Sequence, residues 1–182
     1  MKRFFYFLLI TIFIISFFAC NKKPDSNSTY LELPSSFIPK ENRKDAIDFS
    51  LSTIDGGFIS LQDLKGKVVL LDFWAEWCGP CKMATPIIVS LYEKYKNSGF
   101  IVIGMNLDDE SDFDKVTDYI KKSKIRYPIT IKGFSIAQKY GVKGIPHFVL
   151  IDKDGKISLT ITGFIQTLER DLTSSIEALL KE

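Results

Sequence analysis

Residues 68–82 read VVLLDFWAEWCGPCK, an apolar run that leads into two cysteines. A nearly continuous apolar run with a single acid, Asp72, is typical of a buried central strand. The residues that follow carry apolar side chains at helical spacing and predict a helix from Pro80 to about position 98. The sequence therefore places Cys78 and Cys81 where a buried strand passes into the first turn of a helix.

This position gives the two cysteines a predicted chemistry. Their spacing brings both sulfurs onto one face of the helix, close enough for a disulfide. Helix N-terminal amides and the helix dipole favour an anion, so we expect Cys78 to have a lowered pKa and to attack as the thiolate. Cys81, one turn deeper, then resolves the mixed disulfide. The alternatives are a structural disulfide, a chance pair, and a zinc half-site, although Cys20 and His147 are the only further Cys and His in the chain.

The elements on either side alternate between strand and helix. Residues 49–51 and 58–60, separated by Asp55-Gly56-Gly57, predict a hairpin. Ser111 and Asp114 resemble a capping box and predict a helix that runs to Lys122. Further strands are predicted at 100–105, 129–131, 147–151 and 157–161, and further helices at 134–140 and 167–180. This order indicates an α/β sandwich with a mixed sheet.

The first 20 residues have the pattern of an export signal. Lys2 and Arg3 precede an apolar stretch, residues 4–19, whose 16 residues reach roughly 24 Å as a helix and fall short of the roughly 30 Å hydrocarbon core. The small residue before Cys20 resembles a bacterial lipoprotein signal, although such sites usually carry Leu at the place of Phe17. The alternative is an uncleaved anchor. We expect a signal peptide over 1–19, a lipidated tether over 20–45 and a domain over 46–182.

Charge outside this signal is balanced. Removing Lys2 and Arg3 from the 24 basic residues leaves as many basic as acidic side chains, 22 of each. A neutral domain gives no electrostatic reason to expect nucleic-acid binding. Three cysteines in 182 residues are also too few for a disulfide scaffold.

Residues 71–83 resemble the active-site segment of thioredoxin, and Gly144-Ile145-Pro146 resembles the cis-proline loop of that family. The hairpin ahead of the active-site strand and the segment 111–131 resemble the TlpA/ResA-like branch of membrane-anchored thiol-disulfide oxidoreductases, which includes reductases of cytochrome c maturation. The resemblance covers residues 46–182. It implies a thioredoxin-like three-layer α/β sandwich with a mixed central sheet, an N-terminal hairpin and an inserted strand-helix segment.

The resemblance also assigns roles to residues. Asp72 matches the buried acid that relays a proton for Cys81, and a lone carboxylate in an apolar strand has a raised pKa. Two positions depart from the pattern. Gly104 stands where thioredoxins carry a lysine, and Ala84 stands where cytochrome reductases of this branch often carry a glutamate.

The residues predicted to bind substrate surround the cysteines. A cis bond between Ile145 and Pro146 leaves the preceding backbone free to pair with a substrate strand. The resemblance also implies that Pro146 keeps metals away from the thiolates. His147 either places a cation near Cys78 or points away along its strand. Trp77, with Gly79 and Pro80, completes the predicted substrate-binding set.

These features predict an enzyme, a thiol-disulfide oxidoreductase that lies in the cell envelope and reduces protein disulfides. No cofactor is expected beyond the Cys78–Cys81 pair. The expected partners are disulfide-containing envelope proteins, apocytochrome c among them, a membrane that holds the lipid anchor, and a membrane electron-donor protein that recharges the reductase. We expect a monomer. The alternatives are a thiol peroxidase of the peroxiredoxin type, whose usual Pro-x-x-x-Thr-x-x-Cys pattern does not precede Cys78, and a non-catalytic metal-handling or holdase module.

Overall fold

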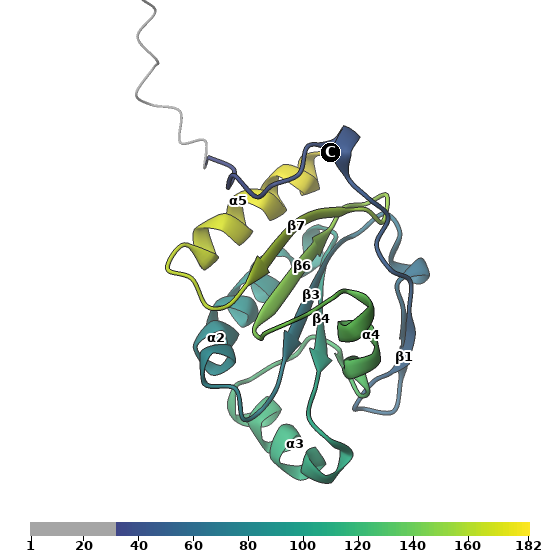
Figure 1. Cartoon of the computed structure of the whole chain (residues 1–182), viewed down its shortest axis with the longest axis vertical. Helices are drawn as coiled ribbons and strands as arrows, with labels where there is room; N and C mark the ends of the chain where they lie inside the picture. Colours follow the sequence, from purple (N-terminus) through teal and green to yellow (C-terminus); the bar gives the residue numbers. More distant parts are fainter. Residues whose placement is uncertain (1–31) are drawn as a thin grey trace, which may run out of the picture. The chain divides into compact units, whose positions relative to one another are not determined.

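In the computed structural model, which describes residues 32–182, a five-stranded sheet lies between two layers (Figure 1). The order of its strands is β5-β4-β3-β6-β7. The strands are β3 (Val68–Trp74), β4 (Phe100–Asn106), β5 (Ile129–Thr130), β6 (His147–Ile151) and β7 (Ile157–Thr162). A separate hairpin is formed by β1 (Ser50–Ser52) and β2 (Phe58–Ser60), as predicted.

The strand that precedes the cysteines, β3, is the centre of the sheet. It pairs in parallel with β4 on one side and antiparallel with β6 on the other, while β6 and β7 form an antiparallel pair. All seven residues of β3 are buried, as the apolar run predicts. The sheet is therefore mixed, and its best-protected strand ends at the candidate site.

Among residues 32–182, four helices complete the layers. They are α2 (Gly79–Tyr95), α3 (Phe113–Lys122), α4 (Gly133–Lys139) and α5 (Leu168–Lys181). One buried cluster joins α2, α3 and α5 to one face of the sheet, and a second joins α4 and the hairpin to the other face. Figure 1 shows α2 and α5 on one side of the strands and α4 on the other. The predicted three-layer sandwich is confirmed.

The predicted capping box is wrong. Residues Glu110–Asp112 form a short 3-10 turn, and α3 begins only at Phe113. Asp112 is the N-cap, and no side chain caps the helix. Its carboxylate instead accepts a hydrogen bond from Lys115 at 2.7 Å. Because Ser111 lies inside the preceding turn, its hydroxyl does not occupy the capping position.

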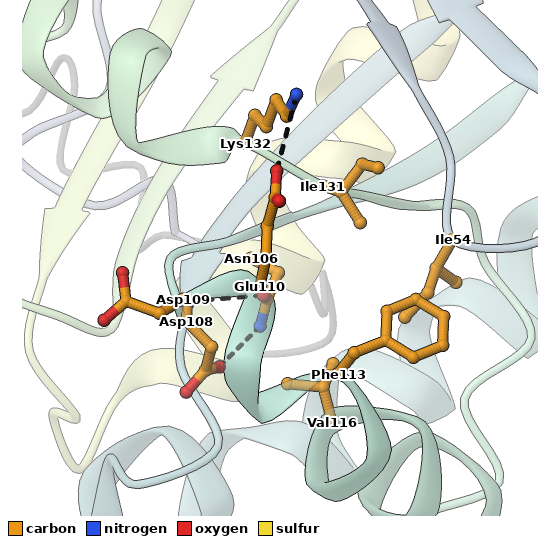
Figure 2. Close-up of a pocket in the computed structure, with 9 residues that line it drawn as sticks. All are labelled: Ile54, Asn106, Asp108, Asp109, Glu110, Phe113, Val116, Ile131 and Lys132. Carbon is orange, nitrogen blue, oxygen red and sulfur yellow. Dashed lines mark hydrogen bonds and ion pairs between the residues drawn. The ribbon is translucent and has the colours of Figure 1, made fainter.

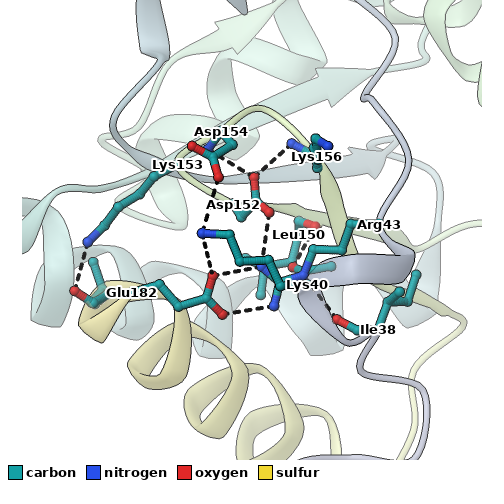
Figure 3. Close-up of polar contacts among 11 residues, drawn as sticks. Ile38, Lys40, Arg43, Leu150, Asp152, Lys153, Asp154, Lys156 and Glu182 are labelled. Atoms are coloured by element: carbon teal, nitrogen blue, oxygen red, sulfur yellow. Dashed lines mark hydrogen bonds and ion pairs between the residues drawn. The ribbon is translucent and has the colours of Figure 1, made fainter.

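Part of the predicted tether lies against the domain (Figure 3). The Arg43 guanidinium donates hydrogen bonds to Asp152 at 2.9 Å and to both carboxylate oxygens of Glu182 at 2.8 Å. Arg43 is only 6% exposed, and its hydrogen bonds lower the pKa of Glu182. A buried guanidinium needs carboxylate partners, so Arg43 fixes this segment to the end of α5 and to the residue that follows β6. No helix within residues 32–182 has the length and apolar character needed to cross a membrane.

Candidate active site

Cys78 and Cys81 form a disulfide at the start of α2. Cys78 is the N-cap of this helix, and its Sγ accepts a hydrogen bond from the backbone N–H of Cys81 at 3.2 Å. The same N–H and the dipole of a 17-residue helix would stabilise a Cys78 thiolate after reduction. The structure confirms the predicted disulfide and its place at the junction of strand and helix.

The rim around the disulfide is more open than the sulfurs themselves. Cys78 is 4% exposed and Cys81 2%, whereas the neighbouring Trp77 is 68% exposed. Gly79 and Pro80 are also exposed, and a Cβ at Gly79 would meet nothing within 4 Å. Proline is compatible with the first turn of a helix because its missing N–H is not needed there. A partner chain can therefore approach Cys78 across this rim.

The predicted loop on the opposite rim contains a cis peptide bond between Ile145 and Pro146. The carbonyl oxygen of Ile145 lies 3.7 Å from Cys78 Sγ. The backbone N–H of Ile145 donates no hydrogen bond to another backbone group among residues 32–182. Cys78 and Ile145 are 67 positions apart in the sequence, yet the fold brings the loop and the reactive sulfur together.

A groove of about 440 Å³ extends from this loop toward α4. Its apolar lining includes Trp77, Phe134, Val142 and Ile145. Phe134 is 61% exposed, although an aromatic ring usually gains from burial. Lys143 is the one charged residue in the described lining. The groove therefore suits an extended peptide that carries an apolar side chain near its reactive sulfur.

Asp72 lies on the face of β3 that packs against α2. Side chains alternate along a strand, so Asp72 shares its face with Leu70 and Trp74, which belong to the same buried cluster as both cysteines. Burial raises the pKa of Asp72 to about 7, and a hydrogen bond from the Tyr127 hydroxyl opposes this rise. The register places Gly104 directly beside Asp72. A carboxyl that titrates near neutral pH is suited to take up and release a proton.

His147 lies on the other face of the sheet. It pairs with Phe73, and the centroids of the two rings are 5.8 Å apart. Its Nδ1 is 2.8 Å from the Thr162 hydroxyl oxygen, and burial lowers the pKa of the ring. Of the two interpretations of His147, the structure favours the second: the side chain shares the face of Phe73, opposite the face whose cluster contains Cys78. Its role in substrate binding stays a prediction.

Asp108 is a positioning residue that the sequence argument did not identify. Its Oδ2 accepts a hydrogen bond from the backbone N–H of Glu76 at 2.7 Å. It accepts a second from the Asn106 side-chain amide, also at 2.7 Å (Figure 2). The bond from Glu76 holds the loop that leads from β3 to Cys78 against the end of β4, and the bond from Asn106 fixes the Asp108 carboxylate in place. The available signal was an acid two residues beyond a buried parallel strand, at the edge of the sheet where functional loops gather.

The cavity in Figure 2 lies beside this loop and has a volume of about 280 Å³. Its apolar side includes Ile54, Phe113 and Val116, while Glu110 and Lys132 form an ion pair at its mouth. None of the predicted site residues lines it. Within residues 32–182, no group of three or more His, Cys, Asp or Glu side chains is arranged to hold a metal ion. Cys20 lies outside the described residues.

Comparisons with known proteins agree with this geometry. A family model described as the AhpC/TSA family matches residues 43–160. Thiol-disulfide oxidoreductase ResA of Bacillus cereus is 37% identical over 143 residues, which are 76% of this chain and 82% of that protein. ResA of Bacillus thuringiensis subsp. konkukian is 40% identical over 121 residues, 66% of this chain and 69% of that protein.

A solved structure gives the same result. The crystal structure of a proposed thiol:disulfide interchange protein DsbE from Chlorobium tepidum superposes with a TM-score of 0.70. It is 34% identical and covers 76% of this chain and 96% of that one. The resemblance stated from the sequence is confirmed. The chain therefore belongs to the AhpC/TSA family, as a thioredoxin-like relative of the ResA thiol-disulfide oxidoreductases.

Proposed function

We propose that this protein is a thiol-disulfide oxidoreductase of the cell envelope that reduces protein disulfides by dithiol–disulfide exchange. The observation that carries the proposal is the Cys78–Cys81 disulfide at the start of α2, with the Ile145 carbonyl beside Cys78 Sγ. The ResA relatives are thiol-disulfide oxidoreductases, which supports the same reaction class for this protein. The Gly-Pro pair between the cysteines resembles that of the reducing members of the superfamily.

The proposed reaction begins with the reduced enzyme. The Cys78 thiolate attacks one sulfur of a substrate disulfide, a bond forms between these two sulfurs, and the other substrate sulfur leaves as a thiolate. Cys81 then loses its proton and attacks Cys78 Sγ. The enzyme disulfide forms, and the second substrate sulfur leaves. Two electrons pass from the enzyme dithiol to the substrate, whose two sulfurs end as thiols after protonation.

Asp72 is the proposed acceptor of the Cys81 proton. It lies on the face of β3 whose neighbours Leu70 and Trp74 share a buried cluster with both cysteines, and its pKa of about 7 supports this role. A free carboxylate at this depth takes the proton when the Cys81 thiol attacks. The carboxylic acid then returns the proton when the substrate thiolate leaves.

The proposed location rests on the first 20 residues. The basic start, the apolar stretch and Cys20 support export and lipid attachment, and both would hold the domain on the outer side of a membrane. In an oxidising compartment the enzyme disulfide needs an electron source, so we propose a membrane protein that reduces Cys78–Cys81 after each turnover. The proposed substrates are envelope proteins that contain disulfides. The TlpA/ResA-like resemblance supports apocytochrome c among them.

The first test is direct. The reduced domain should convert a model protein disulfide to thiols with one disulfide formed between Cys78 and Cys81 for each disulfide reduced. Cys78→Ser should abolish the reaction. Rapid consumption of peroxide without formation of the Cys78–Cys81 disulfide would overturn the proposal in favour of a peroxidase.

A second test identifies the substrates in the cell. Cys81→Ser removes the resolving thiol, so mixed disulfides should accumulate on Cys78 of the full-length exported protein. The matched control is the double variant Cys78→Ser with Cys81→Ser, which should trap nothing. Trapped apocytochrome c would identify a dedicated substrate, whereas a broad set of envelope proteins would indicate general reduction. Trapping of cytoplasmic proteins alone would contradict the proposed location.

A further inference from the structure

The space beside Asp72 is occupied in an unusual way. Gly104 is the direct neighbour of Asp72 across the β3–β4 pair. A Cβ at position 104 would lie 3.0 Å from Trp74 Nε1 and 3.3 Å from Tyr127 Cε2. Because Gly104 has no side chain, it leaves room for the aromatic rings of Trp74 and Tyr127. Both rings pack beside Gly104, next to the Asp72 carboxyl.

Tyr127 contributes the polar contact. Its hydroxyl donates a hydrogen bond to Asp72 Oδ2 over 3.4 Å, which is longer than an ordinary bond from a hydroxyl donor. Tyr127 is 4% exposed, and its ring packs edge-on against Tyr92 with 5.7 Å between centroids. Burial and the nearby Asp72 carboxylate raise the pKa of Tyr127 well above its ordinary value. The phenol thus stays protonated and acts toward Asp72 only as a donor.

None of the other described groups around Asp72 donates a hydrogen bond to its carboxylate. Gly104 of β4 and Phe148 of β6 flank Asp72 in the sheet, and neither titrates. The helix α2 contributes the two cysteines to the same cluster, and α3 contributes Tyr119, whose hydroxyl bonds to Thr85 instead. Lys82 of α2 lies over the Tyr119 ring, 5.5 Å from its centroid, and pairs with Glu76. Within the part of the chain that the structure describes, only Tyr127 hydrogen-bonds to the Asp72 carboxylate.

We propose that Tyr127 is a positioning residue for dithiol exchange: its hydroxyl orients the Asp72 carboxylate and stabilises the charged form that accepts the Cys81 proton. This proposal rests on the proposed function, because it concerns the proton transfer that accompanies Cys81 attack on the mixed disulfide. The proton passes from Cys81 Sγ to the Asp72 carboxylate. Tyr127 keeps its own proton throughout and neither gains nor loses electrons.

The test is the pH profile of mixed-disulfide resolution. Tyr127→Phe removes the donor that favours the carboxylate, so the midpoint of the profile should move upward by about half a unit to one unit, with about three- to tenfold slower resolution below the midpoint. Tyr92→Phe is the matched control, since it removes a phenolic oxygen from the ring that packs against Tyr127. It should leave the midpoint unchanged. In an Asp72→Asn background, Tyr127→Phe should cause no further shift.

A second measurement does not depend on activity or on the stability of the Phe variant. The Asp72 carboxyl can be titrated by carbon NMR in the folded protein, with Tyr127 replaced by 3-fluorotyrosine. This ring is nearly the same size but is a stronger donor, so the Asp72 midpoint should move downward. An unchanged midpoint in both variants would overturn the role of Tyr127. If the Asp72 midpoint shifts in the variants but the wild-type protein reduces no disulfide, the proposed function is overturned instead.

Discussion

Asp72 on β3 and Gly104 on β4 are direct partners in the parallel register of the sheet. The glycine adds no side chain to the space next to the carboxyl, and the rings of Trp74 and Tyr127 fill it. The carboxyl is consequently desolvated by apolar and aromatic groups, with one neutral donor as its partner. This arrangement places its titration near neutral pH, where a proton relay for Cys81 is useful.

The close packing at Gly104 predicts the effect of adding one methyl group. A Cβ at Gly104 would lie 2.3 Å from Ile129 Cδ1 and 3.0 Å from Trp74 Nε1, so Gly104→Ala should lower the free energy of unfolding by about 1–3 kcal/mol. Urea denaturation at constant slope measures this change. Gly144→Ala is the control, because a Cβ there would meet nothing within 4 Å. Equal midpoints for the two variants would contradict the packing argument.

The raised pKa of Asp72 predicts a pH-dependent stability. The folded pKa is about 7 and the ordinary value is 3.8. Between these values the unfolded chain ionises first, so the free energy of unfolding falls as pH rises, by at most on the order of 4 kcal/mol. Asp72→Asn removes this loss. On the oxidised protein, the variant should gain stability over wild type from pH 5 to pH 8, as measured by thermal or urea denaturation.

The opposite outcome is equally clear. If the difference in unfolding free energy between wild type and Asp72→Asn stays constant from pH 5 to pH 8, the pKa of Asp72 is not raised by burial. A variant that loses stability relative to wild type as pH rises would give Asp72 a lowered pKa, and would contradict the relay.

The Arg43 contacts predict that the segment before position 46 is part of the folded domain. Arg43→Ala leaves Asp152, whose side chain is 2% exposed, without its cation, so it should cost about 3–5 kcal/mol. Lys40→Ala is the control. Its ion pair with Asp154 is exposed on both sides and should contribute at most about 1 kcal/mol. The loss of stability in each variant is measured from its urea midpoint. A small loss for Arg43→Ala would show that the segment before position 46 belongs to the tether and not to the folded domain.

Local patterns in the sequence were sufficient for much of the fold and for the centre of the site. Three features can be interpreted from neighbouring residues alone: the apolar run of β3, the Cys78–Cys81 spacing and the lone acid Asp72. The run of apolar neighbours predicts that this strand is buried, and burial sets the environment of Asp72 and the cysteines.

Contacts between distant segments were beyond such patterns. Tyr127 is 55 positions from Asp72, and Arg43 is 109 from Asp152, so no local period links either pair. Asp108 holds the Glu76 backbone across 32 positions. The capping box failed for a related reason, because the choice between a 3-10 turn and a capped helix depends on where the chain leaves β4.

The groove predicts a role for its exposed aromatic side chains. Trp77 is 68% exposed and contributes little to the core, so Trp77→Ala should leave stability and kcat nearly unchanged while raising KM for a protein substrate by about three- to tenfold. Phe58→Ala is the control, since Phe58 is 71% exposed on β2 and does not line the groove. Steady-state reduction of a protein disulfide measures both constants. An equal rise in KM for both variants would contradict a specific contact.

The central claim is that the Cys78–Cys81 pair donates electrons to substrate disulfides. The most direct measurement is its reduction potential, obtained by equilibrating the domain with glutathione or dithiothreitol buffers and quantifying the disulfide. We predict a value near that of thioredoxin, about −270 mV, because a Gly-Pro pair separates the cysteines as in the reducing members. A value near that of strong oxidants, about −120 mV, would contradict the assignment as a reductase.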